Sequence, residues 1–123
     1  MAFDRLCLVG PGAMGLLHAA YLKRAGFDVH LLDHNPGRAA SLNREKIILA
    51  GERPEAFDLP CHAVPDFGPV DLIVFFVKAY STFEAAAHAA PLIGDDTILL
   101  TLQNGLGNVE IIEQYQRLDR VFA

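Results

Sequence analysis

The sequence lacks any apolar run long enough to cross a membrane. Its longest strictly apolar run covers residues 72–77, whereas a bilayer-spanning helix needs roughly 20 apolar residues. A secretory signal peptide is missing as well, because Asp4 and a glycine-rich turn stand where its apolar segment would be. We therefore expect no membrane association and a cytoplasmic location.

Basic residues and cysteines are also scarce. The chain carries 10 Lys and Arg against 15 Asp and Glu, a net charge of −5, and it has no basic run that would favour nucleic acid as a partner. Its two cysteines, Cys7 and Cys61, lie in apolar, strand-like segments. Buried reduced thiols are therefore expected rather than a disulfide, a metal site or a nucleophile. The five histidines show no ligand-like clustering, so no metal is predicted.

Apolar residues are abundant, at 52% of 123 residues, against a usual share of about 45–50%. This composition is sufficient for one domain, residues 1–123, with a hydrophobic core. Strands are expected at 6–9, 29–32, 72–77, 97–102 and from 121, and helices at 13–25, 36–44, 82–90 and 108–117. This alternation predicts an α/β, Rossmann-like fold, in which a doubly wound, mainly parallel sheet has helices on both faces.

Three local features refine this expectation. Residues 47–64 contain glycine and proline between short apolar segments, which predicts a small hairpin or an excursion of the chain, followed by an edge strand near 62–64. The pair Asp95-Asp96 predicts a turn. In the helix 13–25, Met14, Leu17 and Tyr21 fall on one face, with Ala20 beside them, and this face should pack on the sheet.

Three glycines with the spacing G-x-G-x-x-G follow the first strand, in the segment Gly10-Pro11-Gly12-Ala13-Met14-Gly15. The first glycine allows a tight turn, the second lets a pyrophosphate approach the backbone, and the third lets the helix pack close to the sheet. The helix then directs its N–H groups and partial positive charge at the phosphates. The strand before and the helix after match the dinucleotide-binding fingerprint. The alternative is a glycine-rich turn without a ligand.

Asp33 ends the second expected strand, 18 residues after the last glycine of the fingerprint. A carboxylate at this place accepts hydrogen bonds from both hydroxyls of the adenosine ribose and repels a 2′-phosphate, so it favours NAD(H) over NADP(H). Arg38, one helical turn further on, would temper this preference by reaching the phosphate. The alternatives are a turn or helix-capping role for Asp33 and a solvated helix position for Arg38.

Two further polar residues follow buried strands. Lys78 comes directly after the run 72–77, and Asn104 follows the strand 97–102. Because ligands bind at the carboxyl ends of the strands in a parallel sheet, Lys78 is expected to meet a ribose, a phosphate or a carboxylate substrate. Asn104 offers a donor and an acceptor to the nicotinamide ribose or to a substrate hydroxyl. The alternatives are a lysine that leaves the strand for solvent and a plain turn asparagine.

Three elements together resemble the N-terminal domain of the ketopantoate reductase (2-dehydropantoate 2-reductase) family, from about residue 6 to the end: the glycine segment 10–15, Val77-Lys78-Ala79-Tyr80 and Leu102-Gln103-Asn104-Gly105-Leu106-Gly107. The resemblance implies the reduction of ketopantoate to pantoate, usually with NADPH, on the route to pantothenate. It implies that Lys78 contacts the cofactor near the nicotinamide and that Asn104 touches the nicotinamide ribose and the substrate. It also implies a helical C-terminal domain that supplies a general-acid lysine and a substrate-holding glutamate.

The chain departs from this family pattern in two ways. It has no counterpart of the C-terminal domain, so we expect a truncated dinucleotide-binding domain without a catalytic residue of its own. Such a domain should be inactive alone and should expose an apolar face prone to self-association. Second, Asp33 stands where NADPH-using members carry a basic residue. The cofactor could therefore be NAD(H), and the substrate could be a 2-oxo acid other than ketopantoate. The alternatives are a related hydroxyacid dehydrogenase and a stand-alone NAD- or nucleotide-sensing Rossmann module.

Overall fold

A computed structural model of the chain describes residues 4–10, 12–44, 47–49, 55–76, 82–102 and 108–122. The strands are β1 (Arg5–Val9), β2 (Asp28–Leu32), β3 (Ile47–Leu49), β4 (Glu55–Phe57), β5 (Cys61–His62), β6 (Val70–Phe75), β7 (Ile93–Thr101) and β8 (Val121–Phe122). The α-helices are α1 (Ala13–Arg24), α2 (Pro36–Arg44), α3 (Thr82–Ala89) and α4 (Asn108–Ile112). Two short 3-10 helices, η2 (Ala90–Leu92) and η3 (Leu118–Arg120), precede β7 and β8.

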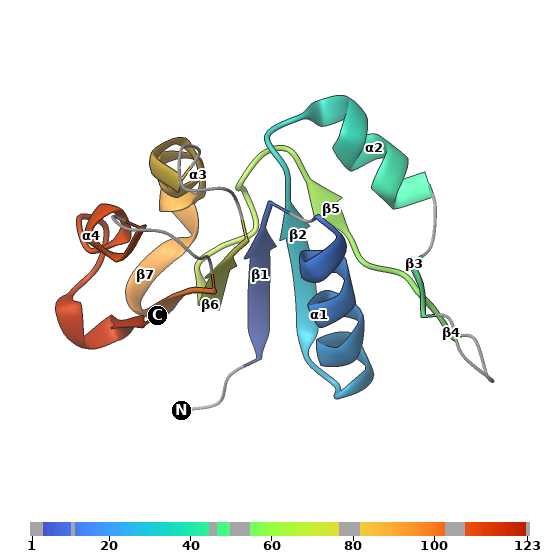
Figure 1. Ribbon diagram of the computed structural model, residues 1–123, viewed down its shortest axis with the longest axis horizontal. Coiled ribbons are helices and arrows are strands. Elements are labelled where there is room, and N and C mark those ends of the chain that lie inside the picture. Colours follow the sequence, from blue (N-terminus) through green and yellow to red (C-terminus); the bar gives the residue numbers. More distant parts are fainter. Residues whose placement is uncertain are drawn as a thin grey trace.

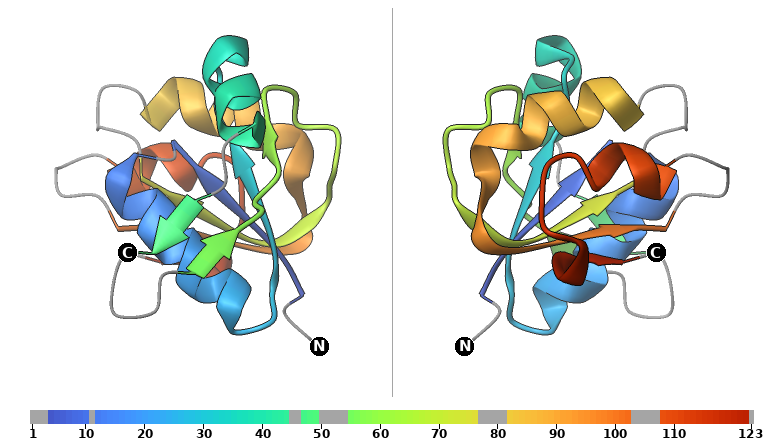
Figure 2. Two further views of the ribbon diagram at one scale, coloured as in Figure 1. Left: turned by 90° about the vertical axis from the view of Figure 1, so that its right-hand side faces the viewer. Right: turned by 90° about the vertical axis from the view of Figure 1, so that its left-hand side faces the viewer.

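Six strands form one sheet in the order β5-β2-β1-β6-β7-β8, and all of their pairings are parallel. The helices α1 and α2 pack on one face of this sheet, and α3 and α4 pack on the other (Figure 1). Figure 2 shows α1 and the antiparallel β3–β4 hairpin toward the viewer on one side, and α4 toward the viewer on the opposite side. The doubly wound, Rossmann-like fold and the hairpin are therefore confirmed.

Alternate residues of the central strands belong to two separate hydrophobic cores, because successive side chains of a strand point to opposite faces of the sheet. On the α3 and α4 face, the fully buried strand residues include Cys7, Ile73, Phe75 and Leu99. On the α1 and α2 face, they include Leu8, Val29 and Leu31. The unbroken apolar runs in the sequence thus correspond to strands that pack on both faces.

The prediction of a turn at Asp95-Asp96 is wrong, because β7 continues through both residues. The β6–β7 register shifts at this point, between Val70 and Leu72. The hydroxyl of Thr97 stabilises the irregular segment, since it accepts the Gly94 N–H at 2.8 Å and donates to the Val70 carbonyl at 2.6 Å. The pair Asp95-Asp96, whose local sequence predicts a turn, thus lies inside a strand because Thr97 bonds to Val70 on the neighbouring strand.

Two other predicted boundaries also move. The last helix ends at Ile112 rather than near residue 117, and the edge strand is Cys61–His62 rather than 62–64. After α4 the side chain of Gln116 donates to the carbonyl oxygens of Gly94 and Thr97, at 2.8 and 2.9 Å. These bonds hold the chain against β7 in a conformation that helical periodicity does not predict.

The predicted sheet-facing side of α1 is wrong for Leu17 and Tyr21, which are 38% and 49% exposed. The prediction is confirmed for Ala20, which is 0% exposed together with Ala19, so the fully buried contacts of this helix are made by small residues. Small side chains allow the helix axis to lie close to the strands, and this places the larger apolar residues at its flank. The side chain of Met14 lies outside the described part of the structure.

Both cysteines are buried and free of a disulfide, as the sequence predicts. Burial raises the pKa of the Cys61 thiol to about 11, and it raises the pKa of Cys7 further. Neither side chain is a thiolate at neutral pH, which makes a nucleophilic role unfavourable. Among the described residues no cluster of three or more His, Cys, Asp or Glu is arranged to hold a metal ion. No helix in this described part is long and apolar enough to span a membrane.

Two histidines on adjacent strands form a hydrogen-bonded row. His30 Nδ1 lies 2.9 Å from His62 Nε2, and His30 Nε2 lies 3.1 Å from Asp28 Oδ1. Phe67 stacks on both rings. Burial lowers the pKa of His62, the neighbouring His30 lowers it further, and Asp66 opposes this shift. Since one proton bridges the two imidazoles, the row requires at least one of them to be neutral.

This row predicts a loss of stability in mild acid. Because the pKa of His62 is lower in the folded chain than its ordinary value of 6.5, the unfolded chain takes up a proton first as the pH falls. The free energy of unfolding should therefore be constant above about pH 6.5 and decrease below it. Urea unfolding between pH 7.5 and 5 measures this slope. His62→Gln should flatten it, whereas His34→Gln, at a side chain that is 89% exposed, should leave it unchanged; an equal slope in both variants would contradict the assignment.

Candidate functional site

The direction in which the sheet is extended reverses between β1 and β6. The chain builds β2 and β5 on one side of β1, and then crosses to build β6, β7 and β8 on the other side. In open parallel sheets, ligands bind at such a switch point, outside the carboxyl ends of the strands. The features that the sequence singles out at the ends of β1 and β2 therefore lie where a ligand is expected.

Gly10 forms the turn that leaves β1. Its φ of 74° lies in the left-handed region that side chains disfavour. Its N–H donates to the Leu32 carbonyl at 3.2 Å, and its own carbonyl accepts the Gly12 N–H at 2.7 Å. The turn is thus fixed to the end of β2 as well as to the start of α1.

Gly12 is the N-cap of α1, in an extended conformation, and no side-chain hydrogen bond caps this helix. A Cβ added at Gly12 would meet no atom of the described residues within 4 Å, so these residues leave the space beside it open. N–H groups in the first turn of a helix have no partner inside the helix, and the helix dipole favours an anion at this end. The open, uncapped helix start therefore fits the pyrophosphate of a dinucleotide. Ala13 and Met14 belong to this first turn, whereas Pro11 lies outside the described residues.

Gly15 lies against the sheet, but less tightly than the fingerprint suggests. A Cβ added there would lie 3.5 Å from Phe76 Cδ2 and 3.6 Å from the Gly10 carbonyl oxygen. These are ordinary van der Waals distances, so the position would accept a methyl group. Glycine at this position lets the helix lie close to the strands, but alanine would also fit there.

Asp33 follows β2 as a buried carboxylate, with a side chain that is 6% exposed. Its N–H donates to the His62 carbonyl on β5 at 2.9 Å. Its Oδ1 accepts the Asn35 N–H at 3.0 Å, which is the turn role considered as the alternative from sequence. A carboxylate has about four acceptor positions, so this turn bond does not exhaust its capacity to accept a ribose hydroxyl.

Arg38 reaches back from α2 to this carboxylate. Its Nε lies 3.1 Å from Asp33 Oδ2, and its side chain is 50% exposed. Asn35 starts the helix, because its Oδ1 accepts the N–H groups of Gly37 and Arg38 at 3.0 and 3.2 Å. This capping, which is favourable for an asparagine that precedes a proline at the first helical position, orients α2 so that Arg38 meets Asp33. The proximity of the two residues is predictable from helical spacing, but the ion pair is not.

Lys78 and Asn104 lie outside the described residues, as do most of the two motifs that contain them. The described ends of β6 and β7, at Phe75 and Thr101, pair with each other and lie at the same rim of the sheet as the end of β1. The roles of Lys78 and Asn104 in binding remain predictions from sequence.

One contact of the site is not predicted from the sequence. The edge strand β5 fixes the position of Asp33, whose N–H donates to the carbonyl of His62. β5 is held in turn by Asn43 of α2, whose amide donates to the Cys61 carbonyl at 2.7 Å and whose Oδ1 accepts the Cys61 N–H at 2.8 Å. No local pattern marks these backbone contacts, because they depend on which strands become neighbours.

Comparison with known proteins gives one consistent result. The family model described as ketopantoate reductase PanE/ApbA matches residues 6–123. The 2-dehydropantoate 2-reductase of Mycobacterium tuberculosis is 34% identical over 112 residues, which cover 89% of this chain and 36% of that protein. The chain therefore spans about a third of the length of this relative.

Solved structures agree with the sequence comparison. The 2-dehydropantoate 2-reductase from Geobacter metallireducens superposes with a TM-score of 0.83 at 29% identity, over 95% of this chain and 39% of that chain. A D-mandelate dehydrogenase in a ternary structure with NADH and anilino(oxo)acetate superposes with a TM-score of 0.86 at 25% identity, over 97% of this chain and 40% of that chain. The fold and the order of its elements are thus shared with enzymes more than twice as long.

Proposed function

Because this chain belongs to the ketopantoate reductase PanE/ApbA family, we propose that it is the cofactor-binding domain of an NAD(P)H-dependent 2-oxo acid reductase that converts 2-dehydropantoate to pantoate. The observation that carries this proposal is the uncapped start of α1 at Gly12, which the described residues leave open at the switch point between β1 and β6. A bound nicotinamide cofactor would supply the hydride for the substrate carbonyl, and the residues of this chain would bind and orient the reactants.

Each residue has a defined part in this proposal. The N–H groups at the start of α1 bind the pyrophosphate next to Gly12, and Asp33 with Arg38 meets the adenosine ribose. By the family resemblance, Lys78 binds near the nicotinamide end, and Asn104 holds the nicotinamide ribose and the substrate. The general-acid lysine belongs to a helical domain that these 123 residues do not include. The chain alone therefore binds dinucleotide without reducing 2-dehydropantoate.

We further propose that the site prefers NADH to NADPH. Asp33 places a carboxylate where a 2′-phosphate would lie, and like charges repel strongly at a buried position. The ion pair with Arg38 offsets part of this repulsion, because the guanidinium lies on the same carboxylate. The relative in the NADH-bound structure, the D-mandelate dehydrogenase, is consistent with NADH use in this fold.

Calorimetric titration of the 123-residue chain with NADH and with NADPH, at one salt concentration, tests the cofactor proposal. Binding of NADH at least several-fold tighter than NADPH is expected. Tighter NADPH binding would show that Arg38 dominates the ribose pocket, and the preference would be wrong. Binding of neither, in a chain that unfolds cooperatively, would contradict the cofactor site in this domain alone.

A second substrate is favoured by one observation. The superposition with a D-mandelate dehydrogenase is as good as those with the reductases, with a TM-score of 0.86. An aromatic 2-oxo acid would then replace 2-dehydropantoate while the cofactor site stays the same. Assays of the chain joined to a family C-terminal domain, with 2-dehydropantoate and with benzoylformate, separate the two by their kcat/KM values.

The chain alone should also self-associate. Leu102 at the end of β7 and Phe122 on β8 are 48% and 50% exposed, and exposed apolar patches promote association. Sedimentation velocity should show an average mass that rises with concentration. Leu102→Lys should reduce this rise more than Phe83→Lys, which changes a 57% exposed side chain on α3. Equal effects of the two variants would place the association elsewhere.

A further inference from the structure

The two faces of β6, β7 and β8 are covered unequally. On the α3 and α4 face, one row of paired residues runs through Cys7, Ile73, Leu99 and Val121. The first three of these are 0% exposed. On the α1 face, the next row runs through Leu8, Val74, Leu100 and Phe122. Here the exposure rises with distance from α1, from 0% at Leu8 and 5% at Val74 to 50% at Phe122.

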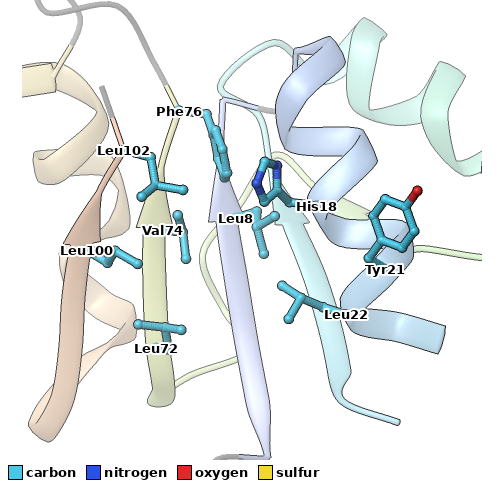
Figure 3. Close-up of a pocket in the computed structure, with 9 residues that line it drawn as sticks. All are labelled: Leu8, His18, Tyr21, Leu22, Leu72, Val74, Phe76, Leu100 and Leu102. Carbon is cyan, nitrogen blue, oxygen red and sulfur yellow. The ribbon is translucent and has the colours of Figure 1, made fainter. Parts of the chain in front are cut away.

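A groove of about 320 Å³ lies on this less covered face, between α1 and the strands β1, β6 and β7 (Figure 3). We call it the α1 groove; its lining residues are Leu8, His18, Tyr21, Leu22, Leu72, Val74, Phe76, Leu100 and Leu102. None of these described lining residues is Asp, Glu, Lys or Arg. At one end of the groove the rings of His18 and Phe76 lie 5.3 Å apart.

The chemistry of the groove favours an apolar helix over a polar ligand. A charged occupant would lose hydration and meet no Asp, Glu, Lys or Arg among these described residues, whose polar side-chain atoms are confined to His18 and Tyr21. Parallel sheets are covered by helices on both faces, and α1 forms one wall against which a neighbouring helix would pack at about 8–10 Å between axes. A single apolar stripe on that helix would cover Leu72, Leu100 and Leu102 together.

We infer that the α1 groove seats an apolar helix from the part of the full-length protein that follows β8. This inference rests on the proposed function, because the relatives extend over nearly three times the length of the matched part; the chain covers only 36% of the Mycobacterium tuberculosis protein. Phe122, on β8, stands on the same face as Leu100, its paired residue in the groove. A chain that continues from β8 therefore starts beside the surface that it would cover. The seated helix would hold the two domains in a fixed relation next to the cofactor rim.

Single cysteines report whether the groove is covered. Leu100→Cys and Leu102→Cys place a thiol in the groove, and Phe83→Cys places one on the opposite face as a matched control. Each is made in the 123-residue chain and in that chain joined to the remaining part of the Mycobacterium tuberculosis relative. The native Cys7 and Cys61 are buried and should react slowly. Labelling by a thiol reagent at low protein concentration should slow at least about 10-fold at both groove positions on joining, while Phe83→Cys reacts equally in both proteins.

Three outcomes would overturn the inference. Groove thiols that react equally fast in the chain and in a folded, monomeric joined protein would mean that the following polypeptide does not cover the groove. Groove thiols already protected in the chain alone at the lowest concentration would assign the groove to a second copy of the chain. If the joined protein does not fold, the same cysteine is placed at the position aligned with Leu100 in the intact relative, where fast labelling would again contradict the inference.

The same proteins separate this inference from the proposed function. Calorimetric titration with NADH reports the cofactor site, whereas thiol labelling reports the groove. If the groove thiols are protected in a joined protein that binds no dinucleotide, the helix in the groove is supported and the cofactor proposal is rejected. If the joined protein binds dinucleotide but its groove thiols are unprotected, the cofactor proposal is supported and the helix in the groove is rejected. Fluorescence of an apolar dye provides a check without substitution, since it should be bright with the chain alone and dim with the joined protein.

Discussion

Gly12→Asp is expected to lower the affinity for NADH by at least about 100-fold and to leave the fold as stable as before, or slightly more stable. The position is an N-cap in an extended conformation, and a Cβ there meets none of the described residues within 4 Å. Aspartate is a favourable N-cap residue, and its charge suits the positive end of the helix dipole. The same carboxylate would occupy the place proposed for the pyrophosphate and repel it. A 100-fold loss corresponds to about 2.7 kcal/mol of binding free energy.

Calorimetry with NADH and urea unfolding measure the two effects in the same protein. Gly12→Ser is the matched control, because serine caps the helix equally well but carries no charge; its loss of affinity should be clearly smaller. Gly15→Ala tests the third glycine of the fingerprint, and its added methyl should be tolerated at distances of 3.5 Å and longer. Retained NADH affinity in Gly12→Asp would place the pyrophosphate elsewhere and remove the main support for the proposed function.

Asp33→Asn is expected to reverse the cofactor preference, with a change of about 100-fold in the ratio of the NADH and NADPH affinities. The amide accepts hydrogen bonds from ribose hydroxyls more weakly than the carboxylate, because bonds to charged groups contribute about 1.5–3 kcal/mol against about 1 kcal/mol for neutral ones. NADH affinity should therefore decrease about 10-fold. NADPH affinity should increase by a similar factor, since the repulsion of the phosphate is gone and Arg38 is no longer held 3.1 Å from a carboxylate. The Asn35 N–H still finds an acceptor in the asparagine side chain, so the turn is kept.

Arg38→Gln gives the complementary result. It removes the guanidinium from the Asp33 carboxylate and should weaken NADPH binding several-fold, while NADH binding changes little. Titration of both variants with both cofactors at one salt concentration completes the comparison, and the salt dependence of NADPH binding should be steepest in Asp33→Asn. An unchanged affinity ratio in Asp33→Asn would show that the adenosine ribose does not reach this residue.

The architecture of the site is predictable from the sequence because its elements are formed by residues that are close together in the chain. A strand, a glycine turn and a helix follow one another within residues 6–24, and the conformation of Gly10 is a property of that residue and its neighbours. The same holds for the cap at Asn35 and for the apolar run of β6. Since all strands of the sheet are parallel, their carboxyl ends share one rim, so the sequence also predicts where the site lies.

Local sequence patterns therefore predict the fold class, the order of the elements, the glycine turn and the position of Asp33 at the end of β2. The tertiary structure, by contrast, buries Asp33 and pairs it with Arg38, brings His30 to His62, and continues β7 through Asp95-Asp96. It also decided that Ala19, rather than Leu17, faces the sheet. The physical reason is the same in each case: periodicity fixes which residues share a face, whereas strand register, helix approach and ion pairing depend on elements distant in the sequence.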